Sequence, residues 1–196
     1  ITANARNDGI RNEALSEPVK AEVELSPALS LLARPGDGSI TTRMVAIIVG
    51  TGIDGASVST TADALIAEGA IVRLVGHRVG PFVSAGGPEV LADASLNNQP
   101  SPTFDAVVVP DGQAAIDDLK VDGRALEFLR DAFRHGKTIL AIGAGSDLLD
   151  AADIPLADNP PGVLTGDKAS NALLEDFIQA VALHRHPERE THPPLV

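Results

Sequence analysis

The stretch MVAIIVGTGIDG, residues 44–55, decides the fold of this chain of 196 residues. Its first half, Met44–Val49, is an uninterrupted aliphatic run of the kind that forms a strand buried on both faces of a sheet. Its second half is a glycine-rich loop, and the sequence then predicts a helix over 58–68 that ends at Gly69 and has Ala62, Leu65 and Ile66 on its inward face. A further aliphatic run over 71–75 completes a β-α-β unit.

The same alternation continues along the rest of the chain. The remaining predicted elements are strands over 105–110, 138–142 and 162–165, a hairpin over 81–92, helices over 122–135 and 170–184, and a short helix that ends at Leu149. Strands that alternate with helices indicate an α/β fold with a doubly wound, mostly parallel sheet between two layers of helices. Such sheets bind ligands at the carboxyl ends of their strands, which makes the loops 50–55, 111–113 and 143–146 the candidate site.

Composition divides the chain into three parts. Residues 1–43 are interpreted as an arm or linker, residues 44–186 as the folded domain, and residues 187–196 as a loose C-terminal tail. A short apolar run, Leu25–Leu32, interrupts the otherwise polar arm. Because the chain starts with Ile1 rather than Met, we expect it to be a piece of a longer protein.

Charge argues against several classes of partner. The net charge is −12, and residues 1–43 hold five basic and six acidic side chains whereas residues 44–196 hold ten and twenty-one. The acidic domain offers no basic stripe to a nucleic acid and is disfavoured at anionic membrane surfaces. No apolar run approaches the ~20 residues of a membrane span. Because the N-terminal stretch also lacks the apolar region of a signal peptide, a cytoplasmic location is favoured.

The loop after the first strand carries a weak dinucleotide-binding pattern. Gly50, Gly52 and Gly55 match G-x-G-x-x-G, in which backbone amides and a helix dipole can hold a pyrophosphate. Such a site also needs an acidic residue at the end of the second strand, and Val75-Gly76-His77-Arg78 supplies none. In a chain with 18 glycines a chance match is the simpler interpretation, so no cofactor is predicted for this chain.

The turn Gly143-Ala144-Gly145-Ser146 looks like a nucleophile elbow, a sharp strand-to-helix turn that presents a reactive side chain. Ser146 lies past the tip of this turn and is interpreted as a helix cap. A serine hydrolase would also need a base, and neither His77 nor His135 has a spacing that pairs it with this serine. A hydrolase therefore remains a weak alternative.

A metal site is not predicted. The chain has no cysteine, which removes thiolate ligands as well as disulfides and a cysteine nucleophile. His184 and His186 are two residues apart, so that on a helix they point to different faces, and we interpret both as solvated surface residues.

These loops resemble those of the class I glutamine amidotransferase-like superfamily, whose fold is flavodoxin-like. In that family an A-I-C-x-G run carries the nucleophilic cysteine, and the matching run here, residues 141–145, has Gly143 in its place. Asp54 falls near the family's Glu that orients the thiol, and Pro110-Asp111-Gly112 matches the P-G-G turn that offers oxyanion amides. The resemblance implies a degenerate pocket at Gly143, Asp54 and Gly112 that lacks its nucleophile.

A second resemblance, to the C-terminal domain of large-subunit haem catalases, covers nearly the whole chain. It runs through SPALSLLARPGDGSITTRMVAIIV, DAVVVPDG, GKTILAIGAG and ALLEDFIQAVALHRH. It implies a parent that decomposes hydrogen peroxide at a haem held by a Tyr phenolate. Because this chain has no tyrosine, the haem is expected to lie outside it. The resemblance implies a non-catalytic accessory domain whose partners are the catalase core and the sister subunits of a homotetramer.

Two other functions stay open. Leu25–Leu32 would lose its covering without a catalase core, and an apolar patch on an acidic surface favours a chaperone-like module that binds unfolded proteins. The residual pocket at Asp54, Gly112 and Gly143 is the alternative, as a binding site for a nucleotide or another small ligand.

Overall fold

The computed structural model describes residues 28, 36–86 and 88–189. The chain divides into two units, Ile1–Pro35 and Gly36–Val196. The predicted apolar run Leu25–Leu32 lies outside the described residues except for Ala28, which is exposed. Within the second unit Ile40 is only 1% exposed, so that the core begins ahead of the first strand. The three predicted parts of the chain remain predictions.

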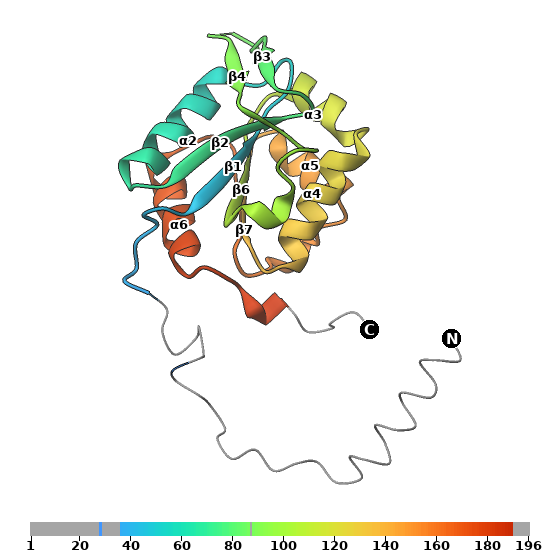
Figure 1. Ribbon diagram of the computed structural model, residues 1–196. Helices are drawn as coiled ribbons and strands as arrows, with labels where there is room; N and C mark the ends of the chain where they lie inside the picture. The colour runs from blue at the N-terminus through green and yellow to red at the C-terminus, as the bar shows by residue number, and fades with distance from the viewer. Residues whose placement is uncertain (1–27, 29–35, 87, 190–196) are drawn as a thin grey trace, which may run out of the picture. The chain divides into compact units, whose positions relative to one another are not determined.

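A parallel sheet of six strands forms the middle layer, in the order β5-β2-β1-β6-β7-β8 (Figure 1). The strands are β1 (Met44–Ile48), β2 (Ile71–Gly76), β5 (Ala94–Ser95), β6 (Ala106–Val109), β7 (Thr138–Ile142) and β8 (Val163–Gly166). Apart from the two-residue β5, the strands follow the flavodoxin-like order 2-1-3-4-5. The predicted fold class is confirmed.

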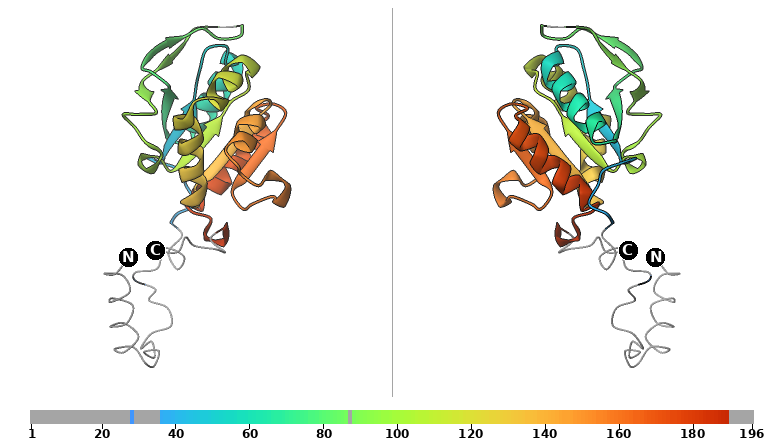
Figure 2. Two further views of the ribbon diagram at one scale, coloured as in Figure 1. Left: turned by 90° about the vertical axis from the view of Figure 1, so that its right-hand side faces the viewer. Right: turned by 90° about the vertical axis from the view of Figure 1, so that its left-hand side faces the viewer.

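Helices cover both faces of the sheet (Figure 2). Helices α2 (Gly55–Ala67) and α6 (Asn171–Ala182) lie on one face, and α3 (Gln113–Lys120), α4 (Gly123–Arg134) and α5 (Gly145–Ala151) lie on the other. Successive residues of a strand point to opposite faces, so β1 feeds both cores. Val45 and Ile47 pack on the side of α2 and α6, whereas Ala46 and Ile48 pack on the side of the other three helices.

Short elements complete the fold. The predicted hairpin is present as the antiparallel pair β3 (Gly80–Phe82) and β4 (Val90–Ala92). Three 3-10 helices are η1 (Ser101–Thr103), η2 (Leu156–Asp158) and η3 (Pro187–Arg189). Within the part of the chain that the structure describes, every helix is too short or too polar to cross a membrane.

Two helices differ from their predictions. In α2, Ile66 is 56% exposed rather than inward-facing, because Val58, Thr61 and Leu65 occupy the buried face. Helix α3 is not predicted at all. It begins after Gly112 without a side-chain cap, so the sequence contains no start signal for it.

Candidate functional site

The loops that follow β1, β6 and β8, together with the last residue of β7, enclose a small crevice. They flank the point between β1 and β6 where the strand order reverses, which is the usual ligand position in such sheets. The cavity has a volume of about 190 Å³, and its lining residues include Asp54, Ser57, Thr60, Asp111, Ile142 and Lys168. No hydrogen bond or ion pair joins the Lys168 ammonium to either carboxylate within the described residues.

Gly143 forms the turn between β7 and α5 with a φ of +55°, a conformation that L side chains rarely adopt. Any side chain added here would meet Asp111, because a Cβ atom would lie 2.5 Å from its Oδ1 and 2.6 Å from its Oδ2. The space that a nucleophile would fill is therefore taken by a carboxylate from the neighbouring loop.

Asp111 lies in the predicted site loop 111–113, but it is not one of the residues named for the pocket, which are Gly143, Asp54 and Gly112. Its Oδ1 accepts hydrogen bonds from the backbone amides of Gly112, at 2.8 Å, and of Ala144, at 2.9 Å. Two amides that converge on one oxygen are the arrangement that stabilises an oxyanion. In this chain both amides already donate to the Asp111 carboxylate. The signal that could have identified Asp111 is its charge, at a position where the resembling family has glycine.

The structure brings Asp54 and Gly112 to the same place as Gly143. The Asp54 Oδ1 caps α2 by accepting from the amide of Ala56 at 2.9 Å, and the Asp54 amide donates to the Asp111 carbonyl oxygen at 2.8 Å. Gly112 has a φ of +136°, and a Cβ there would lie 2.6 Å from the Cα of Ile53. The two loops pack so closely that only glycine fits at this position.

The loop with Gly50, Gly52 and Gly55 is packed rather than open. The Gly52 amide donates to the Val83 carbonyl oxygen at 2.7 Å, and the next two amides donate to Gly50 and Asp111 carbonyl oxygens. A Cβ on Gly52 would lie 2.7 Å from the Ala114 side chain. The amides that would hold a pyrophosphate are therefore used within the fold, and the loop gives no support to dinucleotide binding.

The structure separates the members of the alternative serine hydrolase. Helix α5 begins at Gly145 with Ala144 at its N-cap, so Ser146 is not the cap that the sequence predicts. His135 precedes β7 and Ser146 follows it, which places them roughly 16 Å apart along five residues of strand. His77 follows β2, three strands away from β7, or roughly 14 Å across the sheet.

The interpretation of His184 and His186 as solvated residues is wrong. His186 is 5% exposed, and its Nε2 lies 3.0 Å from the Thr138 hydroxyl. The Nδ1 of His184 lies 2.7 Å from the Arg43 guanidinium. Burial, assisted by the charge of Arg189, lowers the pKa of His186. Within the described residues no three potential ligands gather into a metal-binding group.

The family model for the C-terminal domain found in long catalases matches residues 41–191. The chain belongs to this family. Among its relatives are catalase HPII of Pseudomonas putida, 33% identical over 173 residues, and catalase HPII of Mycobacterium avium, 34% identical over 193 residues. The matches cover 87% and 90% of this chain but only 23% and 27% of the relatives. The catalase C-terminal domain thus spans about a quarter of the length of the curated relatives that it matches.

A solved structure supports the fold of this catalase domain. A two-domain protein from Anabaena variabilis, with DJ-1/ThiJ/PfpI-like and ferritin-like domains, matches with a TM-score of 0.55 at 24% identity. The match covers 57% of this chain and 34% of that chain, and it shows the flavodoxin-like architecture alone.

The catalase domain does not carry the haem ligand that its family implies. A phenolate ligand requires tyrosine, and none of the 196 residues is tyrosine. The residues of this domain therefore do not fit that mode of haem binding.

Proposed function

We propose that this chain acts as a non-catalytic accessory domain of a long catalase that decomposes hydrogen peroxide, and that it stabilises the oligomer of that enzyme. The observation that carries the proposal is the Asp111 carboxylate in the space beside Gly143. It fills the nucleophile position and occupies the two amides that an oxyanion would need. Loops whose amides donate to a carboxylate of the same chain can stabilise the fold without performing chemistry.

The proposal assigns the peroxide chemistry to the remainder of the longer protein. Haem would be held there by a tyrosine that this chain lacks. The domain would then contribute by packing against the rest of the enzyme, through surfaces that are exposed in its own fold.

Two surface features support a packing role. Three side chains of the β3–β4 hairpin and its flanks, Val79, Val83 and Leu91, are at least half exposed. In addition, among the residues that the structure describes β8 pairs with β7 alone, so one of its edges carries backbone groups without a partner strand there. Burial of such apolar side chains and of a strand edge against a catalase core or a sister subunit would stabilise the assembly.

Deletion of the domain from a long catalase tests the proposal. The truncated enzyme should melt at a lower temperature and dissociate at lower denaturant concentration than the intact enzyme, while it retains its haem absorbance. The matched control is the intact enzyme with Gly123→Ala, a substitution that meets no other atom within 4 Å. Unchanged melting and dissociation of the truncated enzyme would contradict the stabilising role.

A further inference from the structure

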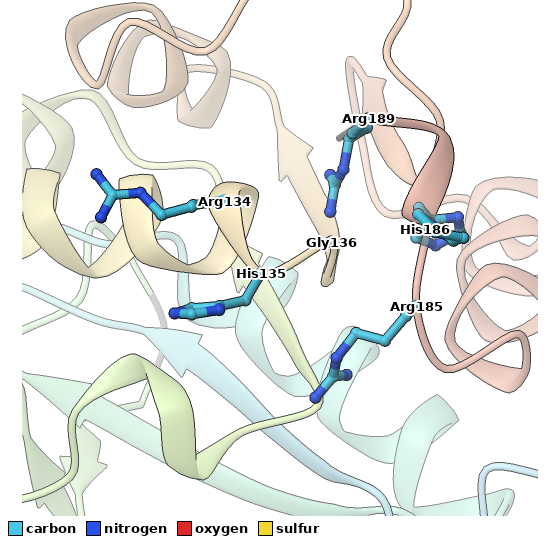
Figure 3. A pocket seen from close by; sticks show the side chains of 7 residues that line it. Arg134, His135, Gly136, Arg185, His186 and Arg189 are labelled. Atoms are coloured by element: carbon cyan, nitrogen blue, oxygen red, sulfur yellow. The ribbon is translucent and has the colours of Figure 1, made fainter. Parts of the chain in front are cut away.

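A second cavity lies at the opposite end of the sheet from the crevice (Figure 3). Its volume is about 270 Å³, and it is lined by three arginines, Arg134, Arg185 and Arg189, and by His135 and His186. Arg134 and His135 come from the end of α4, whereas the other three follow α6. Arg189 extends toward Gly136, whereas the side chains of Arg134 and His135 point away from it (Figure 3). Three arginines around one cavity are unexpected in a chain whose net charge is −12.

The carboxylates around this cavity do not balance its cations. The nearest carboxylate oxygen to Arg185 is Asp105 Oδ1, at 3.9 Å, and the same oxygen lies 3.6 Å from Arg43 and 3.7 Å from His184. One carboxylate therefore faces three basic side chains. Within the described residues neither Arg134 nor Arg189 has an ion pair, and Glu188 acts on Arg189 only through its charge.

Arg189 is the least satisfied of these cations. Its Nη2 donates to the Lys137 carbonyl oxygen at 2.6 Å, and its guanidinium stacks 4.7 Å from the centre of the Phe133 ring. Its Nε and Nη1 are buried without an acceptor among the described residues. Burial lowers the pKa of this guanidinium to about 10. Buried donors without acceptors destabilise a fold, and turning of the guanidinium toward the cavity would let the oxygens of an anion serve as acceptors.

We propose that the cavity between the end of α4 and η3 binds a phosphate group, either free or as a small phosphomonoester. A phosphate dianion matches the excess of positive charge better than a single carboxylate does. Its terminal oxygens also accept the forked hydrogen bonds that a planar guanidinium donates. Arg185 and Arg189 would supply these donors, and the backbone of Gly136, whose carbonyl oxygen accepts from the His186 amide at 2.8 Å, also lines the cavity.

Titration calorimetry of the full chain with inorganic phosphate, glycerol phosphate and acetate at matched ionic strength tests this proposal. Phosphate should bind saturably, and acetate should bind at least tenfold more weakly. A preference for glycerol phosphate over phosphate would identify the ester as the source of the group. Arg185→Gln should weaken phosphate binding at least tenfold, with Arg189→Gln as the second variant.

Arg73→Gln is the matched control, because the exposed Arg73 side chain pairs with Asp93 and does not line the cavity. It should bind phosphate as the unsubstituted chain does. Three results would overturn the proposal: no saturable phosphate binding, equal binding of acetate, or unchanged phosphate binding in both cavity variants. None of them bears on the accessory role, which the deletion experiment tests separately.

Discussion

Gly143 and Asp111 share one small space at the end of β7, and neither position can change without regard to the other. A Cβ on Gly143 would overlap the Asp111 carboxylate, in a backbone conformation with a φ of +55°. We expect Gly143→Ala to lower the free energy of unfolding by about 2–4 kcal/mol, as steric overlap and backbone strain combine. Denaturant unfolding followed by circular dichroism measures this loss.

The control for Gly143→Ala is Gly123→Ala, at the first turn of α4, where a Cβ has open space. It should leave the stability unchanged or raise it by about 0.5–1 kcal/mol, because alanine favours helix. Asp111→Gly combined with Gly143→Ala should cost less than the sum of the single substitutions. Strict additivity would show that the two residues do not compete for this space.

The burial of His186 allows a prediction of how the free energy of unfolding depends on pH. Burial lowers its pKa in the folded state, so the unfolded chain binds more protons once the pH falls to the ordinary pKa of about 6.5. Stability should therefore decrease as the pH falls from about 7.5 to 5.5, by at most about 1.4 kcal/mol per pH unit for each such histidine. Burial shifts the pKa of His184 in the same direction, so both histidines contribute.

Thermal unfolding across this pH range provides the measurement. His186→Gln should reduce the slope, and the exposed His135→Gln should retain it. If stability depends on pH as steeply in His186→Gln as in His135→Gln and the unsubstituted chain, groups other than His186 cause the dependence.

Among the elements, α4 shows the clearest start signal. The Asp122 Oδ1 accepts from the Arg124 amide at 3.0 Å, and the guanidinium of Arg124 donates to both carboxylate oxygens. Asp122→Ala should cost about 1 kcal/mol, since it removes the N-cap. Asp122→Asn should recover most of that loss, because an amide oxygen still caps the helix.

The matched control is Asp118→Ala, on the exposed face of α3, which should change the stability by less than about 0.5 kcal/mol. Urea unfolding compares the three variants. An equal loss in Asp122→Asn and Asp122→Ala would assign the effect to the Arg124 ion pair rather than to the cap.

For the whole molecule, the Asp111 carboxylate in the space beside Gly143 predicts an absence of turnover. The purified chain should not decompose peroxide or hydrolyse peptides and amides. It has no cysteine or tyrosine, and the Asp111 carboxylate occupies the space beside Gly143 in the elbow turn. Oxygen evolution and chromogenic amide assays measure this, with an intact long catalase as the positive control. Gly143→Cys should stay inactive as well, since its Cβ meets the same carboxylate. Activity that follows the chain through purification would contradict the accessory role.

The α/β class, the strand alternation and two of the loops that line the crevice, 50–55 and 111–113, follow from the sequence by itself. The aliphatic runs at 44–49, 106–109 and 139–142 predict buried strands, and their alternation with helices indicates a parallel sheet. Asp122 and Ser170 are readable as helix caps because capping depends on residues near in the chain. The sequence also has Gly143 at the position where the resembling family has its nucleophilic cysteine.

Only the tertiary structure decided what fills the space beside that glycine. Asp111 and Gly143 are 32 positions apart in the chain and meet because β6 and β7 are neighbours in the sheet. The burial of His186 and the basic cavity at Arg189 have the same origin, since both need the end of α4 to lie beside the segment after α6. Contacts between distant segments depend on strand order and register, which no local pattern of residues encodes.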